Sequence, residues 1–187
     1  MTAGPLPVVV VVTSDGCVRG PGGAMRGVLG RSGVRVDKRE GDGATPAGRW
    51  PMRRVLYRPD RLPPPVTGLP VGELASDDGW CDDPADLRYN RPIRLPCAAG
   101  HERLWRDDGL YDLVVVLGHN DDPVIPGRGS AIFMHVARPD GGPTEGCVAF
   151  ALPDLLALVR ACGPGSTLEI HAGTVAPVGS GPGPEQG

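Results

Sequence analysis

The stretch AIFMHVARPDGGPTEGCVAF, residues 131–150, decides the interpretation of this chain. Side chains alternate along residues 131–137, which predicts a β-strand with Phe133 and His135 on one face. The opposite face would carry Ile132, Met134 and Val136. A turn rich in glycine and proline follows, and residues 147–150 predict a second short strand. Two strands joined by so short a connection can bring His135 and Cys147 together.

Apolar runs on both sides of this stretch predict further strands at residues 7–13, 34–37, 50–58, 111–118 and 167–171. Residues 153–162 predict the only good helix, which begins at Pro153 and stops before Gly163. Its apolar face would carry Leu155, Leu158, Val159 and Cys162. We therefore expect a mainly β fold, a sandwich or partly open barrel with one helix packed on the sheet.

The remaining segments have weaker patterns. Residues 59–109 are rich in Pro, Asp and Arg and are expected to form long surface loops, and residues 41–48 (GDGATPAG) to form a turn. We expect a single domain over residues 1–171 and a disordered tail, rich in glycine and proline, over residues 172–187.

Composition excludes several classes of protein. The net charge is −3 and no basic stripe is interleaved with aromatic residues, which argues against nucleic acid as a partner. The longest apolar run, Val8–Val12, is too short for membrane insertion, and no basic residue precedes it as in an export signal. By sequence alone the expected location is the cytoplasm. The oligomeric state is not predicted.

Five cysteines without a CxxC pair disfavour a disulfide framework or a zinc site, although Cys81 and Cys97 could pair in an oxidising compartment. Cys147 is a candidate nucleophile, because a neighbouring imidazole such as that of His135 can take the thiol proton. Gly146 would leave its own amide and that of Cys147 free to stabilise an oxyanion. In the alternative interpretation, Cys147 is a small core residue and His135 a strand histidine with satisfied hydrogen bonds.

Several motifs together resemble one family. The segment HVARPDGGPTEGCVA (135–149) resembles the active-site stretch of the YkuD-type L,D-transpeptidases, in which a histidine precedes Ser-His-Gly-Cys-[Ile/Val]-Arg. EGDGATPAG (40–48) is similar to an early Thr-Pro motif of that family. HERLW (101–105), YDLVVVLGHN (111–120) and GSAIFMH (129–135) follow in the order of a shorter branch. The resemblance covers residues 30–171.

This resemblance implies that Cys147 is a nucleophile that forms a thioester with a peptidoglycan stem peptide, and that His135 is its base. If an amine resolves the thioester, the product is a cross-link. If water resolves it, the protein is a hydrolase: a carboxypeptidase, endopeptidase or amidase. A catalytically inactive wall-binding domain is the alternative from another class. No cofactor and no metal are implied. A peptidoglycan substrate implies the periplasm or cell envelope, which conflicts with the missing export signal.

The chain departs from the family motif at three positions. Thr144-Glu145 replaces Ser-His, and Ala149 replaces the arginine that would contact the substrate. Arg138 is a possible substitute for that arginine. Glu145 could orient a substrate amine or favour water.

Two further histidine-containing segments are candidates for the site. His101 could line the cleft, as the branch resemblance implies, or simply be solvated. The polar run His119–Asp122 could bind a metal, but adjacent side chains cannot all face one ion, so an ordinary turn is the better interpretation. Within it, Asn120 is expected to bind substrate or to hold the scaffold. GDGATPAG lacks the Lys-Ser/Thr ending of a phosphate-binding loop.

Overall fold

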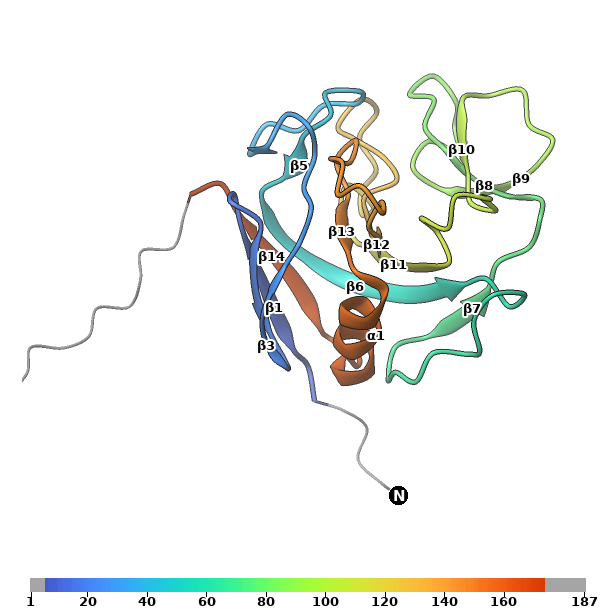
Figure 1. Ribbon diagram of the computed structural model, residues 1–187. Helices are drawn as coiled ribbons and strands as arrows, with labels where there is room; N and C mark the ends of the chain where they lie inside the picture. The colour runs from blue at the N-terminus through green and yellow to red at the C-terminus, as the bar shows by residue number, and fades with distance from the viewer. Residues whose placement is uncertain (1–5, 174–187) are drawn as a thin grey trace, which may run out of the picture.

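The computed structural model describes residues 6–173, and within them the longest strands belong to one nine-stranded sheet (Figure 1). In order across the sheet these are β13 (Val148–Phe150), β12 (Phe133–Val136), β11 (Leu113–Leu117), β6 (Gly48–Tyr57), β14 (Thr167–His171), β1 (Val9–Thr13), β2 (Cys17–Gly20) and β3 (Gly23–Arg26). The ninth strand, β7 (Val71–Glu73), pairs with β6. The predicted mainly β fold is confirmed.

Strand β6 connects the two halves of the sheet. Its first residues, 48–51, pair with β14, whereas residues 52–57 pair with β11 on its other edge. A register irregularity at Val116 and Leu117 interrupts the pairing with β11. Because irregularities of this kind bend a sheet and increase its twist, the sheet can curl on itself.

The two edges of the curled sheet nearly meet beside Cys147. Val28, just after β3, exchanges two backbone hydrogen bonds of 2.8 Å with Ala149 of β13. A second isolated bridge joins Gly30 to Thr144. These bridges nearly close the sheet into a barrel, as the prediction of a partly open barrel requires.

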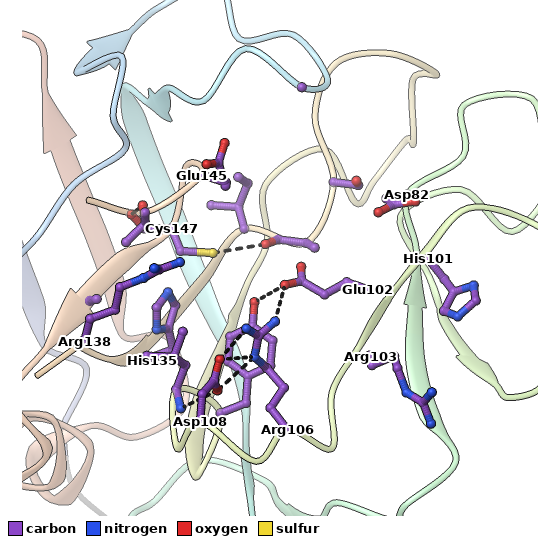
Figure 2. Close-up of a pocket in the computed structure, with 18 of the residues that line it drawn as sticks. Asp82, His101, Glu102, Arg103, Arg106, Asp108, His135, Arg138, Glu145 and Cys147 are labelled. Carbon is purple, nitrogen blue, oxygen red and sulfur yellow. Dashed lines mark hydrogen bonds and ion pairs between the residues drawn. The ribbon is translucent and has the colours of Figure 1, made fainter. Parts of the chain in front are cut away.

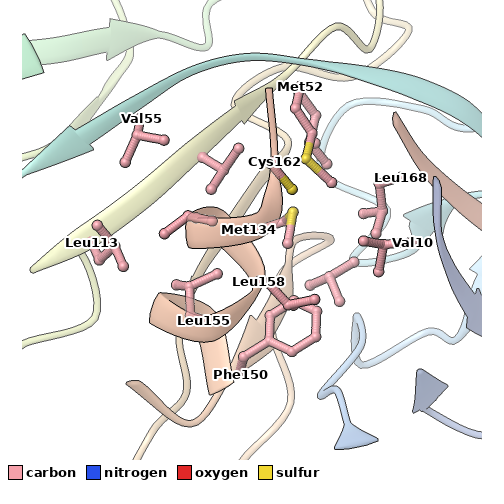
Figure 3. Close-up of a cluster of buried hydrophobic side chains, with 14 of the residues drawn as sticks. Val10, Met52, Val55, Leu113, Met134, Phe150, Leu155, Leu158, Cys162 and Leu168 are labelled. Atoms are coloured by element: carbon pink, nitrogen blue, oxygen red, sulfur yellow. The ribbon is translucent and has the colours of Figure 1, made fainter. Parts of the chain in front are cut away.

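The main hydrophobic core lies between the sheet and α1 (Leu152–Ala161), the one helix within residues 6–173 (Figure 3). The predicted apolar face of the helix is confirmed, since these four side chains are buried: Leu155, Leu158, Val159 and Cys162. The alternation along β12 is also confirmed. Ile132 and Met134 belong to the main core, and Phe133 belongs to a second cluster on the other face.

The expectation that residues 59–109 form only loops is wrong. Besides β7, the segment contains β8 (Asp78–Cys81), β9 (Pro92–Arg94) and β10 (His101–Arg103), which form a small sheet in the order β10-β8-β9. Trp80 of β8 packs edge-on against Phe133, with ring centroids 5.1 Å apart. Strands this short are stabilised by such tertiary packing, and they are too short to show an alternating pattern from which they could be predicted.

One smaller expectation also changes. The predicted turn at residues 41–48 contains β5 (Thr45–Pro46), which pairs with β4 (Val34–Arg35). The five cysteines are free thiols, so Cys81 and Cys97 form no disulfide here.

The predicted tail lies outside the described residues from residue 174 onward. No helix within residues 6–173 is long and apolar enough to cross a membrane.

Candidate active site

An open pocket of about 1030 Å³ lies between the Cys147 end of the barrel and the small sheet. Its walls come from β10, β12, the turn before β13 and the loops at residues 38–41 and 105–111. Figure 2 shows the side chains that line it. Six residues selected from the sequence line this pocket: His101, His135, Arg138, Thr144, Glu145 and Cys147.

Cys147 immediately precedes β13 and is only 8% exposed. Its thiol donates a hydrogen bond to the carbonyl of Ala131 at 3.2 Å and accepts one from the Phe133 N–H at 3.3 Å. Burial, with the nearby Glu102 carboxylate, raises the pKa of the Cys147 thiol to about 12. At neutral pH the side chain is therefore an uncharged thiol.

His135 is held on β12 in one tautomer. Its Nδ1 lies 2.8 Å from the carbonyl oxygen of Val136. Because a carbonyl can only accept, Nδ1 carries the hydrogen and Nε2 keeps its lone pair. The ring is 5% exposed, and burial lowers the pKa of His135 to about 4. The imidazole is therefore neutral and can accept a proton at Nε2.

The backbone of the turn before Cys147 is fixed by two threonine hydroxyls. Thr144 Oγ1 donates to the Cys147 carbonyl at 2.7 Å and accepts from the Gly146 N–H at 3.1 Å. Thr45 Oγ1 donates to the same carbonyl at 3.3 Å. The Gly146 amide is therefore not free, contrary to the expectation that it would face an oxyanion. Within residues 6–173, no hydrogen bond engages the Cys147 amide.

Gly146 is required by its surroundings. Its φ is 142°, a left-handed conformation that favours glycine, and an added Cβ would lie 2.9 Å from the Ala44 carbonyl oxygen. The turn is also tied to the closure of the barrel, since the Arg31 amide donates to the Thr144 carbonyl at 2.9 Å. Arg31 forms an ion pair of 2.8 Å with Glu145, whose side chain is 75% exposed.

The other residues selected from the sequence divide into two groups. His101 and Arg138 line the pocket, and Figure 2 shows Arg138 pointing toward Cys147. Asn120 lies outside the pocket lining: its side-chain amide donates to the Ile125 and Gly129 carbonyls at 2.9 Å. Asn120 therefore holds its own loop together, the scaffold role among the two considered for it.

A polar group that the sequence reasoning missed lies opposite Cys147. The Tyr111 hydroxyl donates to Glu102 Oε1 at 2.5 Å, and the Tyr111 ring packs edge-on against His135 with centroids 5.3 Å apart. Arg106 lies 3.8 Å from the same carboxylate. Glu102 and Tyr111 lie in the segments HERLW and YDLVVVLG, which resemble the family. Nothing in the spacing of these segments, however, indicates that the two side chains meet.

The polar run His119–Asp122 is engaged in structural contacts. His119 Nε2 contacts the Arg128 carbonyl at 3.0 Å, and Asp121 forms an ion pair of 2.8 Å with Arg53. Among residues 6–173, no three His, Cys, Asp or Glu side chains are grouped so that they could hold a metal ion.

Comparison with known families matches residues 20–170 to the model of the L,D-transpeptidase catalytic domain, YkuD. The chain belongs to the YkuD family. The resemblance of its motifs to that family is thereby confirmed. Among curated proteins, the comparison finds no match to this YkuD chain.

Two solved structures share similarity with the YkuD chain. The helical cell shape determining protein Pgp2 from Campylobacter jejuni is 14% identical with a TM-score of 0.50, and the match covers 90% of this chain and 49% of Pgp2. L,D-transpeptidase 1 from Mycobacterium tuberculosis is 13% identical with a TM-score of 0.39, over 89% and 62% of the two chains. The YkuD chain thus spans about half the length of Pgp2 and less than two thirds of the other protein.

Proposed function

We propose that this chain is an L,D-transpeptidase that acts on peptidoglycan stem peptides through a thioester at Cys147. The observation that carries the proposal is the bond from His135 Nδ1 to the Val136 carbonyl. It leaves Nε2 as a base on the wall of the pocket that also holds the Cys147 thiol. Membership of the YkuD family supports the same class of reaction.

Acylation then begins from neutral partners. The Cys147 proton leaves the Ala131 carbonyl and passes to His135 Nε2 while the sulfur attacks a peptide carbonyl carbon. The imidazolium returns this proton to the departing amine as the carbon–nitrogen bond breaks. The product is a thioester at Cys147 and a released amino acid. A second nucleophile, an amine or water, attacks the thioester carbon, and the carbon–sulfur bond breaks. His135 accepts the proton of this nucleophile and passes it to the departing Cys147 sulfur.

Two groups are proposed to stabilise and orient the substrate. The Cys147 amide is the candidate oxyanion donor, because the Gly146 amide is engaged by Thr144. Arg138 is proposed to contact a substrate carboxylate, in place of the family arginine that Ala149 replaces. His101, Thr144 and Glu145 belong to the same pocket; we assign Thr144 to support of the turn.

A peptidoglycan substrate places the activity in the cell envelope, and we propose residues 1–171 as the catalytic domain. The Pgp2 structure is described as that of a determinant of cell shape. By extension from that description, we propose a role in cell-wall remodelling.

Product analysis tests this function. Disaccharide tetrapeptides incubated with the protein should give cross-linked dimers, and Cys147→Ala should give none. Shortened peptides without dimers would indicate a hydrolase. Unchanged tetrapeptides with a folded wild-type protein would contradict the peptidoglycan assignment.

A further inference from the structure

The carboxylate of Glu102 is only partly engaged by protein groups. Oε1 accepts from Tyr111 and lies 3.8 Å from Arg106, whereas Oε2 has no hydrogen bond within residues 6–173. Its side chain, on β10, is 29% exposed and lines the pocket (Figure 2). Glu102 thus keeps one acceptor oxygen available to a bound molecule.

This carboxylate opposes the first step of the reaction. Its negative charge helps to raise the pKa of the Cys147 thiol and so disfavours the thiolate. Arg106 does not fully neutralise the Glu102 carboxylate. The Arg106 guanidinium lies 2.5 Å from Asp108 but 3.8 Å from Glu102. A group that hinders thiol ionisation yet faces the nucleophile is better explained by a role after the thioester has formed.

The surroundings of Glu102 favour a cation. Glu40 and Asp82 line the same pocket, and their charges, added to burial, raise the pKa of Glu102. The nearby Lys38 is buried and paired with Asp42, so its charge is already compensated. Arg138 lies on the opposite wall, beside Cys147 (Figure 2). The pocket therefore has an acidic side at Glu102 and a basic group near the thiol.

We propose that Glu102 binds the primary ammonium group of the acyl acceptor and positions its nitrogen to attack the Cys147 thioester. This inference rests on the proposed transpeptidase function and assigns the residue that holds its amine acceptor. The Tyr111 hydroxyl fixes Oε1 and leaves Oε2 for the ammonium. The adjacent neutral His135 supplies the base for the bond-forming step.

Attack of the acceptor on the thioester removes two protons from its nitrogen. The bound ammonium gives one proton to the Glu102 carboxylate and becomes a neutral amine. Its nitrogen forms a bond to the thioester carbonyl carbon, and the carbon–sulfur bond breaks. A second nitrogen proton passes through His135 to the departing Cys147 sulfur. Glu102 then releases its proton to solvent, and the site is restored.

Acceptor competition tests this role. The acyl-enzyme is formed with tetrapeptide donor and offered Nα-acetyl-lysine amide, which is cationic, or hydroxylamine, which is uncharged at neutral pH. For Glu102→Gln we expect the KM for the lysine probe to rise about tenfold or more, since charge-assisted hydrogen bonds are strong. The ratio of hydroxylamine transfer to hydrolysis should change less than about twofold. Glu102→Asp should restore part of the preference for the cationic acceptor.

Asp107→Asn is the matched control, because Asp107 is an exposed carboxylate among the residues that line the same pocket. This variant should change neither the KM for the lysine probe nor the ratio of hydroxylamine transfer to hydrolysis. In the wild type, added salt should raise the KM for the lysine probe and not for hydroxylamine, a result that needs no variant to fold. Equal effects of Glu102→Gln on both acceptors, or no salt dependence, would overturn the inference alone. A wild type without any Cys147 adduct would overturn the proposed function as well.

Discussion

The Sγ atom of Cys147 lies 3.2 Å from the carbonyl oxygen of Ala131, to which the thiol donates its hydrogen. Ala131 has a φ of 52°, a left-handed conformation uncommon for a residue other than glycine. Its N–H is held by Asn90 Oδ1 at 3.1 Å. The structure thus describes a site in which the Cys147 thiol is protonated and its proton is directed toward the Ala131 carbonyl and away from His135.

Thiol alkylation tests this resting state. Because burial raises the pKa of Cys147 to about 12, its reaction with iodoacetamide should be slow at neutral pH and should accelerate without a plateau up to about pH 10. Half-buried Cys17 is the internal reference and should react faster. Peptide mass mapping gives both rates. A plateau for Cys147 below pH 7 would instead indicate a preformed thiolate–imidazolium pair.

The pKa of His135 predicts acid sensitivity of the fold. Burial lowers it from 6.5 to about 4, so between these values the unfolded chain binds more protons than the folded one. The free energy of unfolding is therefore unaffected by the titration of His135 above about pH 6.5. It decreases by about 3 kcal/mol as the pH falls from there to about 4. Urea unfolding of wild type and His135→Gln at several pH values measures it. Parallel pH profiles for both proteins would contradict this account.

Thr144 is expected to support the turn that precedes Cys147. Thr144→Val leaves the Gly146 N–H without its partner and removes one of the two hydroxyls that donate to the Cys147 carbonyl. We expect a loss of about 1–3 kcal/mol in the free energy of unfolding and slower acylation. Thr144→Ser keeps the hydroxyl and serves as the control. If both variants unfold at the same urea concentration, the hydroxyl does not stabilise the turn.

Gly146 should not tolerate a side chain. In Gly146→Ala the new Cβ would lie 2.9 Å from the Ala44 carbonyl oxygen, so the backbone that carries Cys147 must shift. We expect a destabilisation of about 2 kcal/mol or more and loss of acylation. Gly141→Ala also has a positive φ, of 68°, but its new Cβ would meet nothing within 4 Å, and it should cost about 1 kcal/mol. Thermal unfolding of both variants should therefore show the larger loss for Gly146→Ala, and equal losses would contradict the expected clash and added strain at Gly146.

The sequence predicts the parts of this fold that have strong local patterns. The alternation along β12 places Ile132 and Met134 in the core, and the periodicity of residues 153–162 places Leu155 and Leu158 against the sheet. The short strands β8, β9 and β10 have no such pattern. They depend on pairing with each other and on the contact of Trp80 with Phe133, which are long-range properties.

The site follows the same division. His135 and Cys147 are recognisable because a short connection joins their strands and because the motif resembles a family. The engagement of the Gly146 amide by Thr144 depends on the conformation of a turn. The pairing of Tyr111 with Glu102 depends on how the small sheet packs beside the barrel. Neither is encoded in residue spacing.

Intact-protein mass spectrometry with a tetrapeptide donor tests the central claim most directly. We expect one donor-derived adduct per protein, labile to hydroxylamine as a thioester is, mapped to Cys147 and missing from Cys147→Ala. His135→Gln should form it much more slowly. An adduct that persists in Cys147→Ala, or a folded wild type that never acquires one, would contradict the assignment of Cys147 as the nucleophile.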